Sequence, residues 1–215
     1  MDTRCTPAAR TTRSLLGYGV IAGPLYVGVA VAQALTRDGF DIRRHAWSLL
    51  ANGPLGWIQV TNFVVTGLMT VAAAVGVRRA LAHGRGRTWV PILLGVYGAS
   101  LIGAGIFRAD PAQGFPAAAA ETTTISWHGA LHLAVGGIGF LCLIAACWAL
   151  GSGFSREGRR GLARFSRVTA VAFLAAFAGI ASGSHGPTTL AFVTAVVIVW
   201  AWLTTISVHF YRAAA

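Results

Sequence analysis

The segment WHGALHLAVGGIGFLCLIAACWAL, Trp127–Leu150, decides the fold class of this chain. It contains no Asp, Glu, Lys or Arg, and as a helix it is long enough to cross a hydrocarbon core of about 30 Å. His128 and His132 lie four residues apart at its start, so a helix places both on one face. Because ionisable side chains are costly at the mouth of a membrane helix, this pair suggests a functional site.

The composition of the whole chain agrees with that segment. Of 215 residues, 55% are hydrophobic and 11% are charged, and the mean hydropathy is +0.66, whereas a soluble domain carries about 25% charged residues. All 17 basic residues are arginine, and the net charge is +11. These arginines lie between apolar runs, where they act as topology signals and contact lipid headgroups. We therefore predict a membrane protein that contacts lipids and binds no nucleic acid.

Six apolar runs predict an all-α, polytopic bundle of six transmembrane helices. We expect one membrane domain over residues 1–215, with spans at about 14–35, 57–77, 89–107, 127–150, 168–183 and 188–210. The fifth run is short and rich in small residues, so we expect it to be buried among the other helices. The connection 36–56 is too charged to span and too apolar for a plain linker, so we expect it to fold back onto the membrane surface.

The distribution of arginine predicts the orientation. The N-terminal arm, the second and fourth loops and the C-terminal tail hold 13 arginines, whereas the other three loops hold 4. By the positive-inside rule both termini are cytoplasmic, and the Ala- and Gly-rich composition suggests a bacterial cytoplasmic membrane. Four acids and four histidines then fall on the outer side: Asp38, Asp41, Asp110, Glu121, His45, His128, His132 and His185. Their positions suggest one outward-facing pocket at the mouths of spans three, four and five.

The histidine pair and Asp110 are the first candidates for chemistry. His128 and His132 could act in acid–base chemistry, or they could offer two ligands to zinc, with Asp110, His185 or His45 completing the site. The glutamate of an HExxH motif is absent, so we expect no cofactor and keep zinc as the alternative. In a purely structural arrangement, His128 lies at the headgroup boundary and His132 bonds a neighbouring helix.

Asp110 precedes Pro111 just beyond the third apolar run, and this position supports two interpretations. An aspartate before proline starts a turn. A partly desolvated carboxylate could also donate or accept a proton near neutral pH. The loop that carries Asp110 returns to the fourth span near His128, so we treat both interpretations as equal.

A second group of polar residues lies in the first connection: Asp41, Arg43, Arg44, His45 and Ser48. Its arginines oppose the positive-inside bias, so they are either paired with Asp38 and Asp41 or bind an anion such as phosphate, unless the segment is simply a solvated amphipathic helix. Ser48 could be a nucleophile with a histidine as its base. The aromatic residues Trp47, Phe107, Phe115 and Trp127 either line an apolar pocket for a substrate or belong to the membrane-interface belt and packing.

Three short segments resemble the bacterial DUF998 family of six-span membrane proteins. They are the stretch from Arg43 through Ser48 to Gly56–Trp57, the segment Gly105–Pro111 taken together with Gly114–Pro116, and Gly129–His132. The resemblance implies a six-helix bundle and draws attention to Ser48, Asp110 and His132. Because the function of that family is unknown, it implies no reaction.

Three functions are compatible with these residues. The first is a membrane enzyme for a lipid or isoprenoid substrate, with Asp110 and His132 as an acid–base pair assisted by His128, His185 and Ser48; isomerisation or cyclisation, and hydrolysis, both fit. The second is a transporter or channel subunit, which needs polar groups at mid-membrane, whereas the span centres look apolar. The third is a non-catalytic assembly or sensing protein. The expected partners are membrane lipids and a hydrophobic small molecule, and the oligomeric state is left open.

Overall fold

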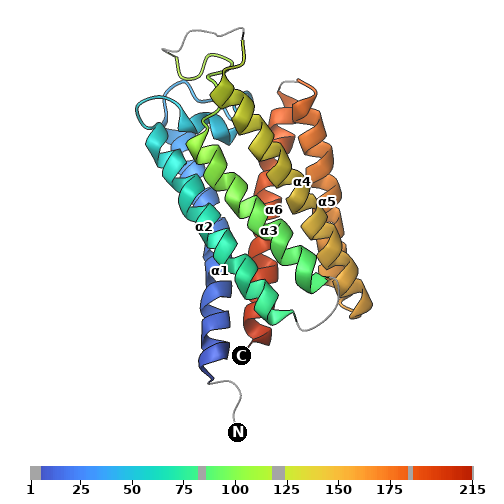
Figure 1. Ribbon diagram of the computed structural model, residues 1–215. Helices are drawn as coiled ribbons and strands as arrows, with labels where there is room; N and C mark the ends of the chain where they lie inside the picture. The colour runs from blue at the N-terminus through green and yellow to red at the C-terminus, as the bar shows by residue number, and fades with distance from the viewer. Residues whose placement is uncertain (1–5, 82–85, 118–123, 184–185, 215) are drawn as a thin grey trace.

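The computed structural model describes residues 6–81, 86–117, 124–183 and 186–214, which form six long α-helices and one short 3-10 helix (Figure 1). The helices are α1 (Pro7–Thr36), α2 (Gly56–Ala80), α3 (Gly86–Ile106), α4 (Trp127–Arg156), α5 (Arg160–Ala181) and α6 (Pro187–Ala213), and the short helix is η2 (Trp47–Ala51). All six long helices are long and apolar enough to cross a membrane. The chain is therefore an all-α, multi-pass integral membrane protein, as predicted.

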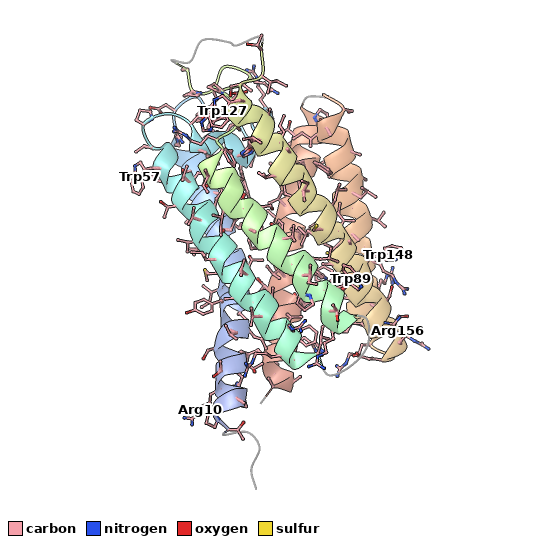
Figure 2. All side chains as sticks on the ribbon, viewed as in Figure 1. Arg10, Trp57, Trp89, Trp127, Trp148 and Arg156 are labelled. Carbon is pink, nitrogen blue, oxygen red and sulfur yellow. The ribbon has the colours of Figure 1, made fainter. Side chains whose placement is uncertain are left out.

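The six helices form a closed ring. Each helix packs against its neighbours in the sequence, and α6 packs against α1 to close the ring. Helix α1 begins and α6 ends at the same end of the bundle (Figure 1). Arg10 and Arg156 mark this arginine-rich end (Figure 2), and the opposite end, which carries the connection 37–55 and residues 107–117, is called the loop end.

Glycines let some of these helices approach closely. A Cβ atom added at Gly67 of α2 would lie 2.6 Å from the carbonyl oxygen of Gly98 in α3, and one added at Gly98 would lie 2.8 Å from the carbonyl oxygen of Gly67. In lipid no hydrophobic force drives helices together, so their association depends on van der Waals packing. Small residues at a crossing allow the backbones to pack closely. The α2–α3 crossing therefore depends on both glycines.

The helices differ from the predicted spans mainly at the arginine-rich end. Helix α5 begins at Arg160 rather than near 168, and α4 continues to Arg156 rather than ending near 150. Arginine keeps its charge in water while its aliphatic stem follows the helix, so a helix extends beyond its apolar run. The expectation that the fifth span is buried among other helices was wrong, since Val168 and Val171 are exposed.

The tryptophans near span ends lie on the outside of the bundle. Trp57 and Trp127 are near the loop end, and Trp89 and Trp148 lie toward the arginine-rich end (Figure 2). All four side chains are exposed. This arrangement is typical of the two aromatic belts at membrane–water interfaces.

Helices α1 and α2 are joined by buried amides that the hydropathy pattern conceals. Gln33 Nε2 donates to Gln59 Oε1 at 2.8 Å, and Asn62 Nδ2 donates to the carbonyl oxygen of Tyr26 at 3.1 Å. These three amide side chains are buried. They lie within about three turns of the loop end and fix the relative height of α1 and α2 beneath the first connection.

Candidate functional site

Two connections fold over the loop end and form a cap, which we define as residues 37–55 with η2 and residues 107–117. Arg37 holds the first part together, because its guanidinium donates to the carbonyl oxygens of Leu50 at 2.5 Å and Asn52 at 2.6 Å. The same guanidinium lies 5.0 Å from the ring centroid of Phe115, in the second part. Burial lowers the pKa of Arg37, and arginine nevertheless stays charged in proteins. The connection thus enters the mouth of the bundle and does not lie on the membrane surface.

His45 fastens the two parts of the cap. Its ring is 2% exposed, the Asp41 backbone N–H donates to Nδ1 at 2.9 Å, and Nε2 lies 3.1 Å from the carbonyl oxygen of Gln113. A backbone N–H can only donate and a carbonyl can only accept, so the hydrogen is on Nε2 and the ring is neutral. Both ring nitrogens are therefore occupied in holding the cap closed.

The arginines beside His45 are not paired with the nearby aspartates. Asp41 Oδ1 accepts a hydrogen bond from the backbone N–H of Arg43 at 2.8 Å, which closes a local turn. Arg44 donates to the carbonyl oxygen of Gln113 at 3.2 Å. Within the described cap no ion pair joins Arg43 or Arg44 to Asp38 or Asp41, so the pairing alternative was wrong, and anion binding by these arginines stays a prediction.

Asp110 braces the start of α4. Its carboxylate accepts hydrogen bonds from Ser126 through the backbone N–H at 2.9 Å and through the hydroxyl at 2.5 Å. The Ser126 hydroxyl in turn accepts from the Gly129 N–H at 3.0 Å and caps the helix. A Cβ atom at Gly129 would overlap the Asp110 carboxylate, so this glycine makes the brace possible.

His132 lies one turn below that brace and binds the end of α3. Its Nδ1 lies 2.7 Å from the carbonyl oxygen of Phe107 and 3.3 Å from that of Ala104. Carbonyl oxygens only accept, so Nδ1 carries the hydrogen and Nε2 keeps a free lone pair in the neutral ring. Among the described residues Nε2 has no hydrogen-bond partner. The contact of Nδ1 therefore orients the imidazole ring, and Nε2 is available to accept a hydrogen bond or a proton.

Beneath the cap, the ring of helices encloses a cavity of about 590 Å³. This volume lies within the range of about 300–1,000 Å³ typical of small-molecule sites. Asp110 and His132 line it together with Ser48, Trp47 and Arg44. No described residue forms a hydrogen bond with the Ser48 side chain. Five of the predicted site residues thus meet at one apolar chamber.

The other predicted site residues lie elsewhere. Asp41, Arg43 and His45 belong to the cap, and Phe115 is buried within it, where its ring packs against Phe40 and His45. His128 is exposed, and its ring centroid lies 3.7 Å from that of Trp127 and 6.0 Å from that of Phe107, outside the cavity. His185 and Glu121 lie outside the described residues.

The structure also bears on the predicted acid–base pair and on the zinc alternative. Asp110 bonds Ser126 and His132 bonds the end of α3, so these two side chains are not joined by a hydrogen bond. In the described part of the chain, no group of three His, Cys, Asp or Glu side chains is placed to hold a metal ion. Because His185 is outside that part, a zinc site stays a prediction.

Aromatic residues that the sequence did not single out contribute to the cavity wall. Phe140 of α4 lies 5.3 Å from Phe177 of α5 and 5.6 Å from Phe192 of α6, measured between ring centroids. On the other side, Tyr26 and Tyr97 face the chamber from α1 and α3. Their spacing in the sequence resembles ordinary helix packing, so no local signal separates a cavity wall from a packed core.

Comparisons with known proteins identify a family and no closer relative. A family model described as "Protein of unknown function (DUF998)" matches residues 20–209, nearly the whole chain. Searches of curated proteins and of solved structures gave no match.

Proposed function

The chain belongs to the DUF998 family, whose function is unknown, and we propose that it is an integral-membrane enzyme that performs acid–base chemistry on a lipid or isoprenoid. The observation that carries this proposal is the position of His132. It presents an imidazole nitrogen with no hydrogen-bond partner among the described residues to a mostly apolar cavity inside a membrane-spanning bundle. An ionisable side chain at that depth is costly to place, so its presence points to a function.

His132 is the proposed general base. The Phe107 carbonyl fixes its tautomer and ring orientation, which is how a histidine base is usually held. When Nε2 takes a proton from water or from the polar end of the substrate, the new positive charge faces the C-terminal carbonyls of α3 and the nearby Asp110 carboxylate. Both favour a cation. The same proton can then be returned to the product.

The other predicted catalytic residues take supporting roles in this proposal. Both Asp110 oxygens are engaged with Ser126, which suits electrostatic support better than proton donation and argues against a free carboxylic acid that protonates an isoprenoid. Ser48, whose hydroxyl is unpaired at the cavity, could position the substrate or act as the nucleophile. We therefore favour hydrolysis or base-assisted isomerisation over acid-initiated cyclisation.

Transport receives less support from the interior of the bundle. Between the cavity and the arginine-rich end, large side chains fill the ring, among them Leu94, Leu143 and Trp202, which are fully buried. In the described residues this packing lies between the chamber and the arginine-rich end. A transporter would need a path, or two alternative packings, through this layer.

The proposed setting is the cytoplasmic membrane of a bacterium, with the arginine-rich end in the cytoplasm. That end carries most of the arginines, and the cap and cavity would then face the outer leaflet. Labelling of single cysteines with a membrane-impermeant maleimide in intact cells tests this orientation. A cysteine at Asp38 should react and one at Arg212 should not.

The test of the function uses His132→Asn. The asparagine amide nitrogen occupies the place of Nδ1, so it can still donate to the Phe107 carbonyl, but the variant has no group at the place of Nε2. The matched control is His128→Asn, which changes an exposed histidine outside the cavity. Total lipid extracts from cells expressing each variant are compared by mass spectrometry.

We expect wild type and His128→Asn to change the same lipid or isoprenoid species, relative to cells without the protein. His132→Asn, present at an equal level in the membrane, should leave that species unchanged. The proposal fails if His132→Asn acts like wild type, or if wild type changes no lipid or isoprenoid.

A further inference from the structure

One side of the cavity opens to the outside at membrane depth. Leu133 of α4 lines the cavity and is also 63% exposed, so the same side chain contacts the chamber and the exterior. Gly136, one turn further, lines the cavity too, and a Cβ atom there would meet nothing within 4 Å. This part of α4 therefore leaves open space between the chamber and the surroundings.

The opening lies between α4 and α5. These two helices are close at the arginine-rich end and separate toward the loop end (Figure 1). A Cβ atom at Gly137 would lie 3.8 Å from the tip of the Phe177 ring, and the rings of Phe140 and Phe177 meet below it. Ile180 faces the cavity on the α5 side above them. The opening is thus bounded below by the phenylalanines, and it continues toward the loop end, where the exposed Ile125 also lines the cavity.

The depth of this opening matches a lipid chain. With a rise of about 1.5 Å per residue, Leu133 lies about 9 Å and Gly136 about 14 Å below the start of α4 at Trp127. Trp127 itself belongs to the interfacial belt, so the opening lies at the level of the acyl chains of one leaflet. The helix of a partner protein is about 10 Å across. It is too wide for the opening between α4 and α5, which the ring of Phe177 nearly closes at Gly137.

We propose that the hydrocarbon chain of a lipid from the leaflet at the loop end enters the cavity sideways between α4 and α5. The chain passes Gly136 and lies against Phe140 and Phe192, while its polar end stays under the cap near His132 and Ser48. This inference rests on the proposed function because it takes a lipid as the substrate. It adds the route by which that lipid enters the cavity, between α4 and α5.

The experiment uses a phospholipid with a photoreactive diazirine near the end of one acyl chain. The full-length protein is reconstituted in vesicles of phosphatidylethanolamine and phosphatidylglycerol that contain this probe, irradiated, and mapped by mass spectrometry. Gly136→Trp places an indole in the opening. Gly28→Trp is the matched control, because Gly28 is an exposed helical glycine of α1, also with nothing within 4 Å of an added Cβ, and does not line the cavity.

We expect wild type and Gly28→Trp to be labelled at Phe140 or Phe192, and Gly136→Trp to lose this labelling while it keeps labelling on outward-facing residues such as Ile138. Leu133→Trp gives a second test if Gly136→Trp does not fold. Undiminished labelling of the cavity in folded Gly136→Trp or Leu133→Trp overturns the lateral route and leaves the proposed function standing. Absence of cavity labelling in wild type overturns the route and, with it, the proposal of a lipid substrate.

Discussion

Replacement of Gly129 by alanine should release the brace at the start of α4. The added methyl group overlaps the Asp110 carboxylate, and a side chain as short as aspartate cannot turn away and still reach Ser126. Both hydrogen bonds from Ser126 to Asp110 are then lost, and the Ser126 cap of α4 is weakened. Loss of a cap costs about 0.5–2 kcal/mol, and loss of a charge-assisted hydrogen bond about 1.5–3 kcal/mol.

Because Ser126 is exposed, water replaces part of the lost hydrogen bonding, so we expect Gly129→Ala to lower the free energy of unfolding by about 1–3 kcal/mol. Gly136→Ala on the same helix is the control, since its methyl group enters open space and alanine favours a helix by up to about 1 kcal/mol over glycine. Reversible unfolding in mixed detergent and dodecyl sulfate micelles, followed by circular dichroism, measures both. Equal stability of the two variants would refute the brace.

Three further changes test other parts of the structure. Gly67→Val should weaken the α2–α3 crossing by about 1–3 kcal/mol, as overpacking does, whereas Gly95→Val, with open space around it, should not; an equal loss in both would contradict the close approach. His45→Ala leaves two backbone groups of the cap unpaired, which costs about 1–3 kcal/mol, so trypsin should cleave the 37–55 connection faster than in wild type. An unchanged cleavage rate would show that His45 does not hold the two parts of the cap together. Asp110→Asn keeps one acceptor for Ser126, so it should reduce lipid turnover less than His132→Asn does. Complete loss of turnover in Asp110→Asn would instead indicate that Asp110 acts as a catalytic acid.

The number and type of the helices could be predicted from the sequence because membrane burial leaves a strong local signal. A run such as Trp127–Leu150 must be helical to satisfy its backbone in lipid. Helix ends were less predictable, since Arg156 and Arg160 interrupt the apolar pattern and still belong to helices. Hydropathy reports where the membrane ends, whereas hydrogen bonding decides where a helix ends.

The candidate site was only partly predictable. His132 stood out because it lies inside an apolar run and Asp110 because it directly follows one, and both line the cavity. The role of His45 was hidden, because its partners are the backbone groups of Asp41 and Gln113, which carry no side-chain signal. The cavity wall was hidden for a related reason, since phenylalanines look the same in a sequence whether they fill a core or border a chamber.

The most direct test of the central claim is cryo-electron microscopy of the wild-type protein in nanodiscs made from bacterial lipids. The account predicts continuous elongated density in the cavity, running from the gap between α4 and α5 past Phe140 and ending within hydrogen-bonding distance of His132 Nε2. A cavity that is collapsed, or that holds only separate water-sized peaks around His132, would contradict it.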